Sequence, residues 1–187
     1  MTPEESFELT KKKGYLVVKG NDLIQRNRFE LSLMEQKTVA YICSMIKPID
    51  SGFQSEYEFK IRDYCKICDI DYDNGANYAY VKETLKKLRD RSMCDRCLYP
   101  ASDLRRSETW DDGWLDRVTT NKKSGLAHIR IDDRLIPYLF DLKQQFTQYQ
   151  LYNILGMKSA FSVRIYELMK SYSFRHTIIF ELNELKE

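Results

Sequence analysis

The chain has 187 residues, 43% hydrophobic and 31% charged, which suits one globular domain or one domain and part of another. It contains no uncharged apolar run of about 18 residues, and its start, MTPEESFELTKKKG, is polar. We therefore expect neither a membrane-spanning helix nor a secretion signal. The five cysteines then indicate a reducing compartment, so we expect a cytoplasmic protein without a closed set of disulfides.

The net charge of +2 is distributed unevenly along the chain. Residues 76–106 carry 8 basic and 4 acidic groups, a net charge of +4, whereas residues 1–75 carry 11 and 13, a net charge of −2. The remaining segments, 107–157 and 158–187, are close to neutral at −1 and +1. An anionic partner is therefore expected to bind residues 76–106.

The first part of the chain predicts a strand, a helix, a second strand and a short helix. YLVVK at 15–19 has the composition of a strand and is followed by a polar link. Ser32 and Glu35 have the spacing of a capping box and predict the start of a helix that Pro48 ends. YEFKI at 57–61 alternates as strands do, and the short helix RDYCKIC follows it.

The clearest helix is predicted over 78–91, after the turn signal DYDNG. It has a buried stripe of Val81, Leu85 and Leu88 and, beside it, a basic stripe that we define as Lys82, Lys86 and Arg89. Strand-like stretches follow at MCDRCLY, WLDRVTT and LAHIRI, the last two joined by the turn NKKSG. This order predicts an α+β winged helix-turn-helix, which we assign to residues 1–150.

The remaining residues, 151–187, repeat the beginning of the same pattern. Residues 159–172 predict a helix with Phe161, Ile165, Leu168 and Tyr172 on one face. TIIF at 177–180 predicts a strand, and Asn183 could cap a further helix. We interpret this segment as the beginning of a second, incomplete winged helix.

The basic stripe lies on the second helix of the helix-turn-helix, which enters the major groove of DNA in such modules. We therefore expect Lys82, Lys86 and Arg89 to contact the groove and phosphates, with backbone contacts from Arg91 and from Lys122 and Lys123 at the wing. Arg164 is a weaker candidate, because it could instead pair with a core carboxylate. The alternative for the stripe is an ordinary solvated face.

Two Cys-x-x-Cys pairs, Cys65–Cys68 and Cys94–Cys97, raise the question of a zinc site. The first pair lies on a short helix that the fold buries, and free cysteine behaves there as a small hydrophobe. The second lies on an expected strand, where a separation of three places the side chains on opposite faces. We favour buried cysteines and expect neither metal nor cofactor. A zinc- or redox-sensing winged-helix repressor is the alternative.

Enzymatic activity is not expected. The two histidines, His128 and His176, stand alone in strand-like or turn contexts. The sequence has no glycine-rich phosphate loop and no serine nucleophile motif. A module that serves only for oligomerisation is a further alternative to DNA binding.

Several short stretches, in this order and spacing over about 15–187, resemble the initiator (Rep) proteins of iteron-containing plasmids. They are Asn21-Asp22-Leu23, Leu31-Ser32-Leu33, Glu35-Gln36-Lys37, Leu85-Lys86-Lys87-Leu88, Trp114-Leu115, Ile136-Pro137-Tyr138-Leu139, Phe146-Thr147-Gln148-Tyr149 and Arg164-Ile165-Tyr166-Glu167-Leu168. The cysteine pairs are not part of this pattern.

The resemblance implies a non-catalytic plasmid replication initiator with two winged helices in tandem. Such proteins bind direct repeats (iterons) in the duplex DNA of the plasmid origin and help to open it. They recruit host replication initiation factors and helicase, and they repress their own gene as homodimers. In this family the first winged helix usually dimerises and contacts the DNA backbone, and the second supplies most base reading.

Overall fold

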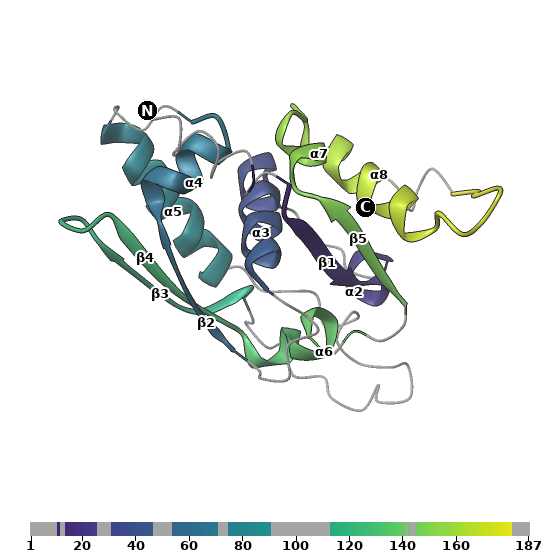
Figure 1. Cartoon of the computed structure of the whole chain (residues 1–187), viewed down its shortest axis with the longest axis horizontal. Helices are drawn as coiled ribbons and strands as arrows, with labels where there is room; N and C mark the ends of the chain where they lie inside the picture. Colours follow the sequence, from purple (N-terminus) through teal and green to yellow (C-terminus); the bar gives the residue numbers. More distant parts are fainter. Residues whose placement is uncertain are drawn as a thin grey trace.

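Helix α3 (Leu33–Met45) lies between two groups of elements in the computed structural model (Figure 1). One group contains α4, α5 and a three-stranded sheet, and the other contains β1, β5, α7 and α8. The structure describes residues 11, 14–25, 31–46, 54–70, 75–90, 113–140, 142 and 145–180. Arg91, Cys94, Cys97, Asn183 and the expected strand MCDRCLY lie outside these residues.

The predicted capping box at the start of α3 is confirmed. Ser32 Oγ accepts a hydrogen bond from the Glu35 amide at 3.3 Å, and Glu35 Oε2 accepts one from the Ser32 amide at 2.7 Å. Residues Thr38 to Cys43 are all buried, so this stretch of the helix is covered on every side. This follows from its position between the two groups.

The first group is a winged helix, as predicted. Strand β2 (Glu56–Lys60) leads into α4 (Ile61–Ile67) and α5 (Gly75–Asp90), and then come β3 (Leu115–Asn121) and β4 (Leu126–Ile131). The strands form an antiparallel sheet in the order β2-β4-β3. Its inner face is apolar, with Phe59 opposite Ala127 in the register. Helix α5 begins at Gly75, slightly before the predicted start.

The second group contains the predicted strand near 15–19, which is confirmed, and several elements that the sequence patterns did not predict. Strand β1 (Leu16–Gly20) pairs antiparallel with β5 (Phe146–Gln150). The expected polar link begins with a short helix, α2 (Asn21–Gln25), whose Leu23 and Ile24 are buried. The 3₁₀ turn η3 (Asp133–Leu135), α6 (Ile136–Leu139) and α7 (Tyr152–Leu155) complete the connections. Such short elements depend on tertiary packing, which leaves little local signal.

Helix α8 (Ala160–Ser171) forms where expected, capped by Ser159, and Leu168 of the predicted apolar face is buried. Phe161 is 58% exposed, while Glu167 and Ser171 are buried. The predicted strand over 177–180 was wrong, because no described segment pairs with it.

The division of the chain at residue 150 stays a prediction. Among the described helices, none has the length and apolar character needed to cross a membrane.

The burial of Glu167 in α8 is explained by a buried ion pair. Lys19 Nζ of β1 lies 2.7 Å from Glu167 Oε1, and the two side chains are only 4% and 6% exposed. The Tyr149 hydroxyl of β5 donates a hydrogen bond to the same carboxylate oxygen. Arg164 donates a hydrogen bond to the main-chain carbonyl of Ile24, which ties α8 to α2. Polar contacts thus decide which face of α8 is buried.

Replacing one partner of this pair should destabilise the protein strongly, because the other charge would remain buried without its partner. We expect Lys19→Met to lower the free energy of unfolding by about 3 kcal/mol or more. We expect Lys19→Met/Glu167→Leu to cost much less than the sum of the single changes. Urea unfolding measures all three, with exposed Lys170→Met as the control. Additive costs would show that the pair is not coupled.

Candidate nucleic-acid interface

Helix α5 is fixed to the core by one side, which determines the side it presents to solvent. The predicted stripe of Val81, Leu85 and Leu88 is confirmed, since each side chain is at most 1% exposed. Thr84 is also buried, and its hydroxyl donates to the Tyr80 carbonyl at 2.9 Å. The helix therefore cannot rotate about its axis without exposing this apolar surface.

The basic stripe lies beside that buried surface, on successive turns of α5. Lys82, Lys86 and Arg89 are exposed, as predicted. Arg89 Nε lies 2.6 Å from Asp90 Oδ1, an ion pair that the sequence analysis did not predict. The Arg89 guanidinium holds the pKa of the Asp90 carboxyl below its usual value. The two lysines therefore carry the uncompensated positive charge of the stripe.

The turn between β3 and β4 presents two more lysines at the predicted wing. Asn121 Oδ1 accepts hydrogen bonds from the main-chain amides of Lys123 at 2.9 Å and Ser124 at 3.3 Å. Gly125 has φ +68°, a conformation that favours glycine, and closes the turn with a hydrogen bond to the Asn121 carbonyl at 2.9 Å. Lys122 and Lys123 are exposed at its tip.

The structure adds two cations near the wing that sequence reasoning missed. The Ile61 amide donates to the Gly125 carbonyl at 2.9 Å, so the base of the wing lies against the start of α4. Lys60 and Arg62, on either side of Ile61, are exposed there. Only the contact between the wing and α4 shows that these two cations lie near the wing, because their sequence positions do not distinguish them from other basic residues. A second cationic region thus lies next to the wing.

Gly113 couples the wing to α5. A Cβ atom at this position would lie 2.0 Å from the Arg89 carbonyl oxygen and 2.8 Å from that of Leu88. The amide of Trp114, which is buried, donates to the Leu88 carbonyl at 2.8 Å. The two residues that precede β3 therefore cap the last turn of α5, and this contact sets the strand, and with it the wing, relative to the basic stripe.

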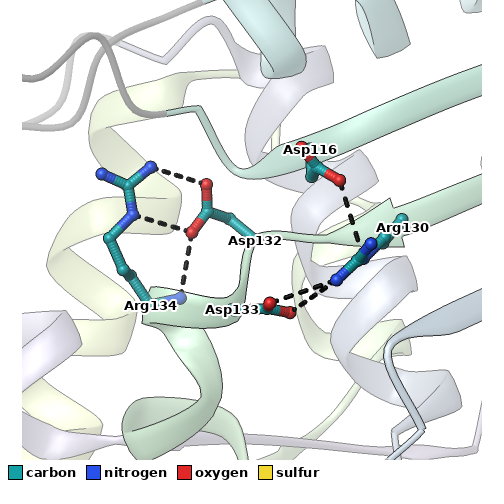
Figure 2. A network of polar contacts seen from close by, with 5 residues as sticks. All are labelled: Asp116, Arg130, Asp132, Asp133 and Arg134. Atoms are coloured by element: carbon teal, nitrogen blue, oxygen red, sulfur yellow. Dashed lines mark hydrogen bonds and ion pairs between the residues drawn. The ribbon is translucent and has the colours of Figure 1, made fainter.

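At the end of the sheet away from the wing turn, charges are paired instead (Figure 2). Arg130 Nη2 lies 3.1 Å from Asp133 Oδ2, and Arg130 Nε lies 3.6 Å from Asp116 Oδ2. Asp132 accepts from Arg134 through Nε at 2.9 Å and Nη2 at 2.8 Å. These arginines stabilise the β4–η3 junction, and their charges are balanced locally. They are therefore poorer candidates for binding an anion than the lysines.

The cysteines of the first Cys-x-x-Cys pair lie in the core, with Cys65 and Cys68 at most 7% exposed. Burial raises the pKa of the Cys65 thiol to about 11, which disfavours the thiolate that a zinc ligand needs. Among the described residues, no three Cys, His, Asp or Glu side chains gather in a geometry suited to a metal ion. Cys94 and Cys97 lie outside the described residues, so their role stays a prediction.

The arrangement of helices, sheet and wing matches known replication proteins. A family model described as "Initiator Replication protein, WH1" matches residues 16–170, most of the chain. The chain belongs to this initiator family. The resemblance to Rep proteins is therefore confirmed. No curated protein matches the sequence.

A solved structure of the Pi initiator protein in complex with iteron DNA has a similar fold. The TM-score is 0.69 and the sequence identity 18%, and the match covers 93% of this chain and 72% of the Pi chain. At that identity the likeness shows a shared fold. In the present chain, α5 and the wing are the winged-helix elements that carry the exposed lysines of the candidate interface.

Gly113→Ala should separate β3 from α5, because the added methyl group would collide with main-chain oxygens that cannot rotate away. We expect a loss of about 2 kcal/mol or more in the free energy of unfolding, measured in urea. Gly156→Ala is the matched control, because a Cβ at Gly156 meets no atom within 4 Å. Equal stability of the two variants would contradict this account of the α5–β3 contact.

Proposed function

We propose that this chain is a plasmid replication initiator that binds direct repeats in the duplex DNA of a plasmid origin, without catalysis by the protein. The observation that carries the proposal is the basic stripe on α5 in a member of the initiator family. That helix has the place in the winged helix that enters the major groove in such modules. The Pi initiator, which has the same fold, is known in complex with iteron DNA.

In this proposal, attraction between lysines and phosphates supplies most of the affinity. Lys82 and Lys86 contact the phosphates that border the major groove, and Lys122 and Lys123 bind the backbone beside the wing. Lys60 and Arg62 extend the cationic surface at the start of α4. Because β3 is fixed to α5 at Gly113, the helix and the wing would meet the duplex together.

Selection of bound duplexes from a random pool tests the repeat-binding function. We expect enrichment of a defined motif, with affinity increased when the motif is repeated directly at helical spacing. Salt-sensitive binding without any enriched motif would contradict iteron binding and leave a non-specific DNA-binding module.

The contribution of the stripe can be measured from the salt dependence of affinity. We expect Lys82→Ala/Lys86→Ala to weaken binding similarly on all sequences and to reduce the slope of log K against log salt by about one unit per lysine. Fluorescence anisotropy at several salt concentrations provides the slope. Lys158→Ala/Lys170→Ala, which removes two exposed lysines near and on α8, should leave the slope unchanged. The same reduction in both variants would contradict a role specific to α5.

We also propose that the outer face of the β2-β4-β3 sheet mediates homodimer formation. Glu56 and Glu58 lie on the edge strand β2, and Arg117 lies on the opposite edge strand, β3. Between them, His128 Nδ1 lies 3.1 Å from Glu58 Oε2, on the wall of an open pocket of about 440 Å³. Two copies facing each other about a two-fold axis would place the acidic edge of one against the basic edge of the other.

Charge reversal tests this surface. Glu56→Lys/Glu58→Lys should shift the protein toward monomer in sedimentation equilibrium, and the added change Arg117→Glu should restore association. Unchanged association in both variants would place the dimer surface elsewhere.

We also propose that the chain recruits host replication initiation factors and helicase, and that it does so in the cytoplasm. Membership of the initiator family supports this part of the proposal. Co-precipitation of a purified replicative helicase with the chain on origin DNA tests it. No helicase in the precipitate would contradict this part of the proposal.

A further inference from the structure

We infer that Asp90 is a positioning residue that holds Arg89 for reading a guanine base in the bound duplex. This inference rests on the proposed DNA binding by α5 and deepens it. It assigns base recognition to one residue of the helix and phosphate attraction to the lysines. The observation behind it is the Arg89–Asp90 pair at the exposed end of the basic stripe.

The geometry of the pair leaves the recognition edge of Arg89 available. Asp90 Oδ1 accepts from Arg89 Nε at 2.6 Å. Within the parts of the chain that the structure describes, the two terminal nitrogens of Arg89 have no hydrogen-bond partner. The guanidinium is a rigid planar fork, so fixing Nε also fixes the plane in which the terminal nitrogens point. A side chain with many rotamers is thereby restricted before it meets DNA.

The main chain at Arg89 is also held in a fixed position. Its carbonyl lies so close to Gly113 that no Cβ could fit between them. The preceding Leu88 is fully buried, and its carbonyl accepts the Trp114 amide at 2.8 Å. Arg89 therefore projects from a clamped turn while Asp90 holds its side chain. A recognition residue needs both restrictions, because base discrimination depends on donors held in a fixed position.

The chemistry of the stripe separates two tasks. Guanine presents two acceptors in the major groove, O6 and N7, which match two parallel N–H donors of an arginine. Lys82 and Lys86 carry point charges on flexible stems, which suit phosphates and carry little sequence information. Of the three stripe residues, only Arg89 forms an ion pair with a described acidic residue, although Lys86 also helps to lower the pKa of Asp90. Arg89 is thus the stripe residue that is built for base reading.

The sign of the effect of Asp90 distinguishes this role from a simple charge effect. A carboxylate on a helix in the groove repels phosphates, so its removal should strengthen binding to every duplex if charge alone matters. If Asp90 positions Arg89, its removal should instead weaken the preference for one guanine. Glu83 provides the comparison, because it is an exposed carboxylate on α5 without a hydrogen bond or ion pair to any described residue.

The experiment compares Asp90→Ala, Asp90→Asn and Glu83→Ala on duplexes selected by the wild-type protein. We expect Asp90→Ala to reduce discrimination at one guanine position by about tenfold, and Asp90→Asn, which keeps a hydrogen-bond acceptor, to retain part of it. Glu83→Ala should strengthen binding uniformly. Replacement of that guanine by 7-deazaguanine should weaken wild-type binding and have little effect on Asp90→Ala. Uniformly stronger binding by Asp90→Ala, as for Glu83→Ala, would overturn the inference.

A measurement on the free protein tests the Arg89–Asp90 pair separately from the proposed DNA binding. In the free protein, the Arg89 Nε–H proton should exchange slowly with water by NMR and become fast in Asp90→Ala. Equal exchange in both proteins would overturn the positioning role, whatever DNA the chain binds. Slow exchange in a wild-type protein that binds no duplex would overturn the reading role together with the proposed function and leave an ion pair at a helix end.

Discussion

The close approach of Gly113 to the last turn of α5 is the contact on which the candidate interface depends. Residues 88–90 and 113–115 are separated in sequence, yet the Leu88 carbonyl accepts from the Trp114 amide at 2.8 Å and the Arg89 carbonyl occupies the space of a Gly113 side chain. This places the residues just before β3 at the end of α5, and the β3–β4 hairpin runs back alongside that helix (Figure 1). The helix and the wing therefore form one surface rather than two.

Charges that form ion pairs and charges that remain exposed lie in different parts of the molecule. Away from the wing turn, Arg130 and Arg134 are balanced by three aspartates, and inside the molecule Lys19 is paired with Glu167. These charges stabilise junctions between elements and are costly to separate where they are buried. Lys82, Lys86, Lys122 and Lys123 remain exposed on α5 and the wing. A modest net charge of +2 for the whole chain thus conceals a local positive surface with the chemistry for a polyanion.

Local patterns predicted the elements that have their own signals. The Ser32–Glu35 capping box, the period of Val81, Leu85 and Leu88 in α5, and the alternation in β2, β3 and β4 each depend on residues close in sequence. Helix α2 and strand β5 were missed because they are short and are stabilised by distant partners. The burial of Glu167 in α8 was not predicted, because its partner Lys19 lies 148 positions away in the sequence. In the interface, exposure of the stripe was predictable from the sequence, but the Arg89–Asp90 pair and the docking of the wing on α4 were not.

If α5 and the wing form a single DNA-binding surface, lysine footprinting should detect it. Each exposed lysine would be acetylated with and without duplex DNA and quantified by mass spectrometry. We expect bound DNA to protect the lysines of α5 and the wing together from acetylation, and to protect none of those near or on α8. The first set is Lys82, Lys86, Lys122 and Lys123, and the second is Lys158 and Lys170. Protection of Lys158 and Lys170 with full reactivity of Lys82 and Lys86 would contradict the account.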